Sequence, residues 1–206
     1  EGRQVNFATL VRGLPLDGLW LDPGDVNACR LRSGLVVTAD GMEAEAASPP
    51  VETGPGFDGL LAAWADSGRQ AIEAALGAGY SLEGYSTHIS VSFPGSLAAA
   101  ERYARTFGLV LGRLLEGPDS LGIYVRPRPG RIEFCGEYIE GGRLRSAARF
   151  AVASVRALAA GACPPELDPA LLQGEERFGY RLHRTLAFGF DAYAASPADR
   201  LPLADG

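Results

Sequence analysis

Lysine is absent from this 206-residue chain, so all 19 basic side chains are arginine. A Schiff base, a lysine general base and a P-loop lysine are therefore excluded as catalytic devices. The 25 acidic residues give a net charge of −6 and a pI near 5.0, which weighs against a binder of duplex nucleic acid. Any cationic contact to a phosphate or carboxylate must come from arginine or histidine.

Histidine and cysteine are scarce, which limits the kinds of metal site. The chain has two histidines and three widely spaced cysteines without a Cys-x-x-Cys pair, so a zinc ribbon and a multi-histidine site are excluded. We expect free thiols in a reducing cytoplasm. A metal site would be rich in carboxylates, a donor set that favours magnesium or manganese.

Long apolar runs are also missing. No window of about 18 uninterrupted apolar residues is present, as a membrane-spanning helix requires, and no basic-then-apolar leader opens the chain. Hydrophobic residues make up 47% and charged residues 21%, as in packed globular domains. We expect a cytoplasmic protein without a membrane partner, folded as a single domain over residues 1–195, with a flexible tail at 196–206.

Four segments have the apolar spacing of amphipathic helices. They are residues 57–75, 96–114, 142–160 and 169–193. Ser96 is a favourable N-cap for the second segment. The fourth segment is less regular because Gly174, Gly179 and Gly189 interrupt it.

Three further segments alternate polar and apolar residues with a period of two, which is typical of strands. They are residues 34–48, 86–93 and 131–139. Each has one apolar face and one face that carries acids, histidine or arginine. With the helices between them, the segments predict a two-layer α+β fold in which the helices cover the apolar face and the polar face is open.

The open polar face would gather several titratable side chains. They are Asp40, Glu43, Glu45, His88, Arg131, Glu133 and Glu137. Crowded carboxylates repel each other unless a cation or arginines neutralise them, and a divalent cation is one explanation. The alternatives are a solvated face with scattered ion pairs and, for Asp40, a plain Asp-Gly turn between two strands.

Three motifs resemble the glutamate–cysteine ligases and related amidoligase families. They are residues 38–50 (TADGMEAEAASPP), 84–92 (GYSTHISVS) and 128–138 (RPGRIEFCGEY), and their order and spacing match over roughly residues 1–158. The resemblance implies a glutamine-synthetase-like catalytic domain with a curved antiparallel sheet and helices on its outside. It also implies an ATP- and Mg²⁺-dependent carboxylate–amine ligase, in which ATP phosphorylates a carboxylate and an amine attacks the acyl phosphate.

The resemblance implies residue roles as well. The metal (Mg²⁺ or Mn²⁺) would be held by Glu1, Asp40, Glu45, His88 and Glu133. Because guanidinium groups can bind phosphate bidentately, we also expect His88, Arg126, Arg128 and Arg131 to contact the nucleotide, with Arg131 and Glu133 as the catalytic pair. Glu1 would be the second acid of an N-terminal strand whose first acid lies upstream. The expected partners are an amino-acid or peptide carboxylate, an amine and, since funnel-shaped sheets are often completed by a neighbour, a second copy of the chain.

The third motif departs from the family at Cys135, where that strand usually continues to a second arginine. Arg126, Arg128 or Arg131 would have to replace this contact, or ligase activity is altered or lost. The alternative function is a non-catalytic relative that keeps the sheet and binds a nucleotide, amino acid or peptide. A metal-assisted hydrolase is a third option, and a Cys135 nucleophile is the weakest because nothing places a complete triad around it.

Overall fold

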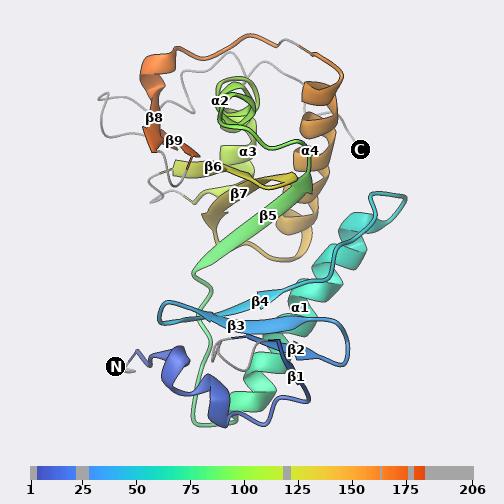
Figure 1. Cartoon of the computed structure of the whole chain (residues 1–206), viewed down its shortest axis with the longest axis vertical. Coiled ribbons are helices and arrows are strands. Elements are labelled where there is room, and N and C mark those ends of the chain that lie inside the picture. The colour runs from blue at the N-terminus through green and yellow to red at the C-terminus, as the bar shows by residue number, and fades with distance from the viewer. Residues whose placement is uncertain (1–3, 22–27, 118–121, 163, 176–178, 184–206) are drawn as a thin grey trace. The chain divides into compact units, whose positions relative to one another are not determined.

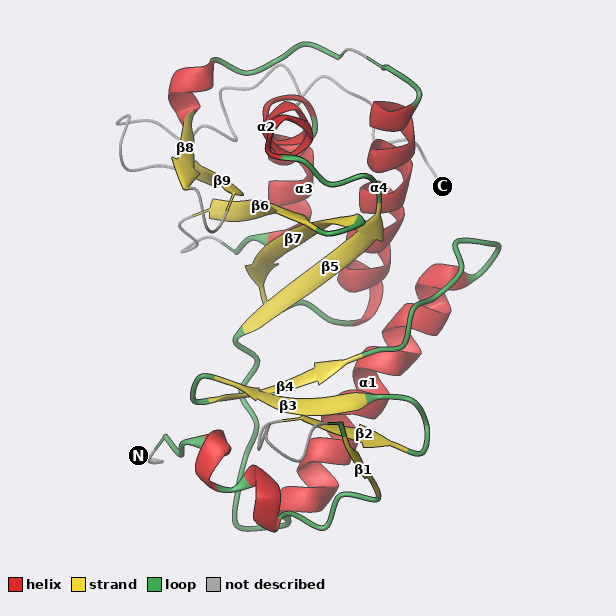
Figure 2. Ribbon diagram, in the orientation of Figure 1, coloured by secondary structure: helices red, strands yellow, loops and turns green. Residues whose placement is uncertain are grey.

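The computed structural model describes residues 4–21, 28–117, 122–162, 164–175 and 179–183 (Figures 1 and 2). The chain divides into two compact units, residues 1–83 (the N-terminal unit) and residues 84–206 (the C-terminal unit). Each unit has its own antiparallel sheet, and four α-helices accompany the two sheets in the described residues. The predicted α+β class is confirmed. The predicted strands fall in two sheets rather than one, because the segment 34–48 pairs only within the N-terminal unit.

The sheet of the N-terminal unit is a meander of four short strands. They are β1 (Gly18–Trp20), β2 (Ala28–Leu31), β3 (Val36–Asp40) and β4 (Glu43–Ala47), in that order across the sheet. Helix α1 (Phe57–Leu76) packs against β4, and two 3-10 turns, η1 (Phe7–Thr9) and η2 (Val11–Gly13), precede β1. Phe7, Val37 and Ile72 bring a 3-10 turn, the sheet and the helix into one apolar core.

The predicted strand over residues 34–48 is the β3–β4 hairpin. Asp40 pairs with Glu43, which leaves Gly41 and Met42 as a two-residue turn. Gly41 has a φ of +61° and Met42 has no positive φ, as in a type II′ hairpin turn. Ala46 lies against Gly68 of α1, so the acids of β4 are on the opposite face, as the alternation predicts.

The C-terminal unit contains a five-stranded antiparallel sheet covered on one face by helices (Figure 2). Its strands are β5 (Ser86–Ser92), β6 (Gly122–Arg128), β7 (Arg131–Glu137), β8 (Leu172–Glu175) and β9 (Gly179–His183), in the order β5-β7-β6-β9-β8. The helices are α2 (Leu97–Thr106), α3 (Gly108–Leu115) and α4 (Gly141–Ala159), which pack against the sheet and against one another. The helix-facing side chains of the central strands are fully buried: Ile123, Val125, Ile132, Phe134 and Leu182.

The first three predicted helices are confirmed, with one difference. The segment 96–114 forms two helices, α2 and α3, because the chain departs from helical geometry at Phe107, where φ is −115°. Ser96 caps α2 as expected, and its Oγ accepts a hydrogen bond from the Ala99 N–H at 3.1 Å. None of the helices in the described part of the chain is both long and apolar enough to cross a membrane.

The predicted fourth helix, residues 169–193, is wrong where the structure describes it. A 3-10 turn, η3 (Pro169–Leu171), leads into the strands β8 and β9, and residues 184–206 lie outside the described residues. Gly179 has a φ of +80° and lies so close to the Val125 carbonyl that no Cβ would fit. In β9, Leu182 is buried while Arg181 points to the opposite face, so the true period is two rather than 3.6.

The segment after β5 is held close to the β6–β7 turn. The Phe93 N–H donates to the Gly130 carbonyl at 3.0 Å. A Cβ on Gly95 would collide with the backbone carbonyl oxygens of Arg128 and Arg131. Glycine at position 95 thus allows the start of α2 to pass beside the turn that carries these two arginines.

Replacing Gly95 should therefore destabilise the C-terminal unit. We expect Gly95→Ala to lower the free energy of unfolding by about 1–3 kcal/mol, because backbone atoms must move to accept the methyl group. Urea unfolding followed by circular dichroism measures this. The matched control is Gly142→Ala in α4, where no other part of the described structure beyond the adjoining helix backbone lies within 4 Å of the added Cβ. Equal stability of the two variants would contradict the packing described.

Candidate functional site

The residues predicted to form one site are divided between the two units. Asp40 and Glu45 belong to the sheet of the N-terminal unit, and Glu1 lies outside the described residues. The remaining predicted residues all belong to β5, β6 and β7 of the C-terminal unit: His88, Arg126, Arg128, Arg131 and Glu133. Each unit therefore has to be considered on its own chemistry.

The predicted acids of the N-terminal unit share one face of the β3–β4 hairpin. Asp40 pairs with Glu43, and Glu45 pairs with Thr38 two positions along. In the described ranges, no three or more His, Cys, Asp or Glu side chains are grouped so that they could hold a metal ion. The hairpin thus places Asp40 and Glu45 on the same surface without gathering a complete ligand set.

The open face of the C-terminal sheet, which we call the arginine face, has a different character. It carries His88, Tyr124, Arg126, Arg128, Arg131, Glu133, Cys135 and Arg181. The strand register sets their order: Ser90, Glu133 and Arg126 are cross-strand partners in one row. The neighbouring row consists of His88, Cys135, Tyr124 and Arg181. Period-two alternation puts these side chains outward because their neighbours in sequence pack against the helices.

Three arginines converge on the carboxylate of Glu133. Arg128 Nε donates to Glu133 Oε2 at 3.0 Å, Arg126 Nη1 lies 3.6 Å from the same oxygen, and Arg131 Nη2 lies 3.9 Å from Oε1. The Glu133 side chain is only 10% exposed, whereas those of Arg128 and Arg131 are 38% and 45% exposed. The carboxylate is thus enclosed, whereas two of the arginines that surround it, Arg128 and Arg131, are partly exposed to solvent.

The arginines also decide the protonation state of this acid. Burial alone would raise the pKa of the Glu133 carboxyl. The hydrogen bond and charge of Arg128, with the charges of His88 and Arg126, outweigh burial and hold the pKa below its ordinary value. Glu133 is therefore ionised at neutral pH, and it is occupied by arginines rather than free to accept a proton.

Cys135 lies beside this cluster as a neutral thiol. Its Sγ is 3.9 Å from Glu133 Oε2, and the residue is buried. Burial raises the pKa of the thiol to about 12; the Glu133 carboxylate adds to the rise, while the Arg126 and Arg128 charges oppose it. Because the thiolate is the nucleophilic form, the geometry does not favour covalent catalysis at this position.

Two members of the arginine face were not predicted from the sequence. Tyr124 lies on β6, where Ile123 and Val125 alternate with it and are fully buried. This alternation over residues 122–128 is readable in the sequence and would have identified the strand. The sequence does not predict the position of Arg181, because the expected helix over residues 169–193 would not place its side chain on a sheet face with Tyr124.

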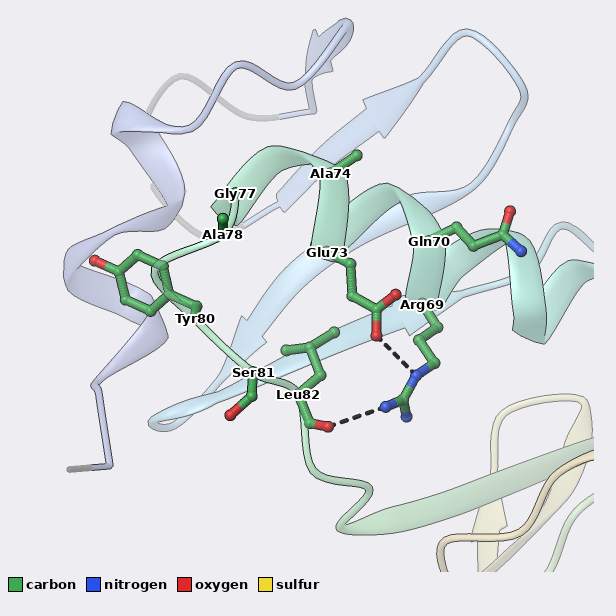
Figure 3. A pocket seen from close by; sticks show the side chains of 9 residues that line it. All are labelled: Arg69, Gln70, Glu73, Ala74, Gly77, Ala78, Tyr80, Ser81 and Leu82. Atoms are coloured by element: carbon green, nitrogen blue, oxygen red, sulfur yellow. Dashed lines mark hydrogen bonds and ion pairs between the residues drawn. The ribbon is translucent and has the colours of Figure 1, made fainter. Parts of the chain in front are cut away.

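A hollow of about 660 Å³ in the N-terminal unit lies at the C-terminal end of α1 (Figure 3). Arg69 spans it, with Nε 3.0 Å from Glu73 Oε1 and Nη2 donating to the Leu82 carbonyl at 2.9 Å. None of the residues predicted to be functional lines this hollow. Arg69 and Glu73 form an ion pair with each other, so we assign no chemistry to this hollow.

The lowered pKa of Glu133 predicts how stability depends on pH. The folded state holds this carboxyl ionised, so its stabilisation is present above about pH 4.3, the ordinary glutamate pKa, and is lost as the pH falls through the lower folded-state pKa. In Glu133→Gln, the free energy of unfolding should therefore fall less steeply below about pH 4.3 than in the wild type. Urea unfolding at a series of pH values tests this. Glu52→Gln, at an exposed carboxylate, is the control and should keep the wild-type slope.

The raised pKa of Cys135 predicts low thiol reactivity. At neutral pH, iodoacetamide should alkylate Cys135 in the native protein more than about 100-fold more slowly than in the urea-unfolded chain, because almost no thiolate is present and the group is buried. Mass spectrometry of the peptide that contains Cys135 gives both rates. Rapid labelling of the native protein would show that this thiol is activated after all.

Comparison of the chain with models of protein families, with curated proteins and with solved structures found no match. The motif resemblance to carboxylate–amine ligases therefore stays a prediction, and the physical case for a function depends on the arginine face.

Proposed function

We propose that the chain is an ATP- and Mg²⁺-dependent carboxylate–amine ligase with a glutamine-synthetase-like fold, and that its arginine face binds the phosphate groups of the nucleotide. The observation that carries this proposal is the convergence of Arg126, Arg128 and Arg131 on the enclosed carboxylate of Glu133. The identity of the acid and the amine, the cytoplasmic location and the assembly with a second copy remain predictions from the sequence.

The arginines have more hydrogen-bond donors than Glu133 can use. Each guanidinium has five N–H donors, and an ionised carboxylate accepts about four hydrogen bonds. Arg128 and Arg131 alone therefore exceed the capacity of Glu133, even though Arg131 Nε also donates to Ser90 Oγ at 3.3 Å. The surplus donors lie on side chains that are more than a third exposed, where an incoming anion can reach them.

Phosphate is the anion that this arrangement suits best in a ligase. Phosphoryl transfer depends mainly on positioning and on neutralising the charge of the phosphate oxygens, and guanidinium groups do both through paired N–H···O bonds. In this proposal Glu133 is a positioning residue, because its enclosed carboxylate holds the arginines in place while their solvent-facing N–H groups contact the ligand. Since no lysine is available, arginine is the only strong cation that the chain can use.

The metal needs a separate consideration. Glu133 is already surrounded by arginines, and their positive charge opposes a cation at the same carboxylate, so the arginine face by itself does not fit Mg²⁺. Mg²⁺ is commonly held by one or two carboxylates together with substrate phosphates and water. Asp40 and Glu45 of the N-terminal unit remain predicted metal ligands. Mg²⁺ that enters together with the nucleotide would neutralise phosphate charge.

A non-catalytic relative is the second candidate, and the character of Cys135 favours it. A neutral, buried thiol occupies the position of the family's second arginine, so β7 itself provides one phosphate-binding cation fewer. Arg126 offsets this loss from the neighbouring strand, because it contacts Glu133 and its charge acts on Cys135. The non-catalytic relative would bind a nucleotide, an amino acid or a peptide; where it binds a nucleotide, the two candidates differ in turnover and not in that binding.

Calorimetric titration of MgATP and MgADP into the full chain tests the proposal. We expect saturable binding that weakens at least tenfold, about 1.4 kcal/mol, in Arg128→Ala, because an exposed phosphate contact is removed. Arg149→Ala, at an exposed arginine of α4, is the matched control and should bind as the wild type does.

Turnover then separates the two candidates. ADP release that requires both a carboxylate and an amine identifies a ligase, whereas binding without turnover identifies the non-catalytic relative. The absence of MgATP and MgADP binding, or an equal loss of affinity in Arg149→Ala, would contradict the proposed nucleotide site.

A further inference from the structure

Tyr124 on the arginine face lies between two guanidinium groups. The Cζ atom of Arg126 is 5.3 Å from the centre of the Tyr124 ring, and that of Arg181 is 5.1 Å from it. Arg181 on β9 is the direct cross-strand partner of Tyr124, whereas Arg126 is two residues further along β6 on the same face. Both distances are in the range of cation–π contacts, so the ring is a platform for two cations.

Among the described residues, no acid forms an ion pair with Arg181, whereas Arg126, Arg128 and Arg131 all contact Glu133. The residue is half-buried, and its Nε atom is buried without a hydrogen-bond partner among the described residues. Its recorded contact in this part of the chain is the Tyr124 ring. A half-buried cation with an unsatisfied N–H group is unfavourable unless an anion or an ordered water completes it.

We propose that Arg181 and Tyr124 form a second oxyanion-binding subsite, which takes the carboxylate of the acid substrate. This inference rests on the proposed ligase function. The ring restrains the guanidinium plane, so less rotamer entropy is lost when the two oxygens of a carboxylate bind to its N–H groups. Arg126 connects the two subsites, since it contacts Glu133 on one side and the Tyr124 ring on the other.

Two adjacent anion subsites are what the first step of such a ligase requires. A carboxylate oxygen attacks the γ-phosphorus of ATP, the bond from that phosphorus to the β,γ-bridging oxygen breaks, and ADP leaves. The amine nitrogen then attacks the acyl carbon, inorganic phosphate leaves, and the nitrogen loses a proton. Carboxylate and phosphate repel each other before the first step, and the positive charges of Arg181 on β9 and of Arg126 and Arg128 along β6 offset this repulsion.

The test compares two probes on two variants of the full chain. Succinate serves as a simple carboxylate and MgADP as the nucleotide, and calorimetry measures each Kd. We expect millimolar succinate binding that weakens at least tenfold in Arg181→Ala, while MgADP affinity stays within about twofold of the wild type. Arg128→Ala should show the opposite pattern, and Arg149→Ala should change neither.

Each other result has a definite meaning. If Arg181→Ala weakens MgADP as much as Arg128→Ala does, Arg181 belongs to the phosphate site and the carboxylate subsite is refuted, although the nucleotide site stands. If the wild type does not bind succinate, the subsite is also refuted. If MgADP fails to bind while succinate binding still depends on Arg181, the proposed ligase function fails and the oxyanion subsite stands.

A folding control completes the experiment. Circular dichroism and thermal unfolding establish whether Arg181→Ala is folded. Arg181→Lys is the second variant, because it keeps the charge and loses the planar fork; it should bind succinate with an affinity between those of the wild type and the alanine variant. Wild-type succinate affinity in both variants would overturn the assignment.

Discussion

The ionised carboxylate of Glu133 determines how the open face of the C-terminal sheet is organised. Three arginines from two adjacent strands lie within 3.9 Å of its oxygens, and without it they would repel one another. The carboxylate is enclosed because Ile132 and Phe134, its neighbours on β7, are fixed in the helix-covered core. The packing of the apolar layer thus sets the position of one acid, and that acid sets the positions of the cations.

The two units distribute charge in opposite ways. The β3–β4 hairpin of the N-terminal unit presents Asp40, Glu43 and Glu45 on one surface. The C-terminal sheet concentrates arginine, and the two acids of β7 are both engaged: Glu133 by arginines, and Glu137 by the Gly117 N–H at 2.6 Å. Although the whole chain has a net charge of −6, the open face of the C-terminal sheet is rich in arginine and has the charge that suits anions. Composition alone argues against polyanionic partners, whereas the strand register shows that the arginines of the C-terminal sheet share one face.

The sequence predicted the faces of strands better than the elements that join them. Alternation in residues 86–93 and 131–139 placed His88, Arg131 and Glu133 on one polar face, because a period of two leaves no other choice once the apolar side is buried. Alternation could not show that the segment 34–48 pairs in a different sheet, since pairing partners are not encoded locally. Apolar spacing over the segment 169–193 predicts a helix with glycine interruptions, but Gly179 instead permits the close approach to the Val125 carbonyl at the start of β9. The place of Arg181 on the sheet is therefore not predicted. The place of Tyr124 is not predicted either, because β6 is not among the expected strands.

The turn between β6 and β7 sets two like charges directly opposite each other. Arg128 and Arg131 are cross-strand partners at its base, an arrangement that works against the hairpin it closes. Glu133, two residues further along β7, offsets the repulsion, but both guanidinium groups are more than a third exposed to solvent. The electrostatic interactions at the tip of this hairpin are therefore sensitive to ionic strength, because dissolved salt screens both the repulsion between Arg128 and Arg131 and their attraction to Glu133. The buried cross-strand pairs further from the turn are little affected.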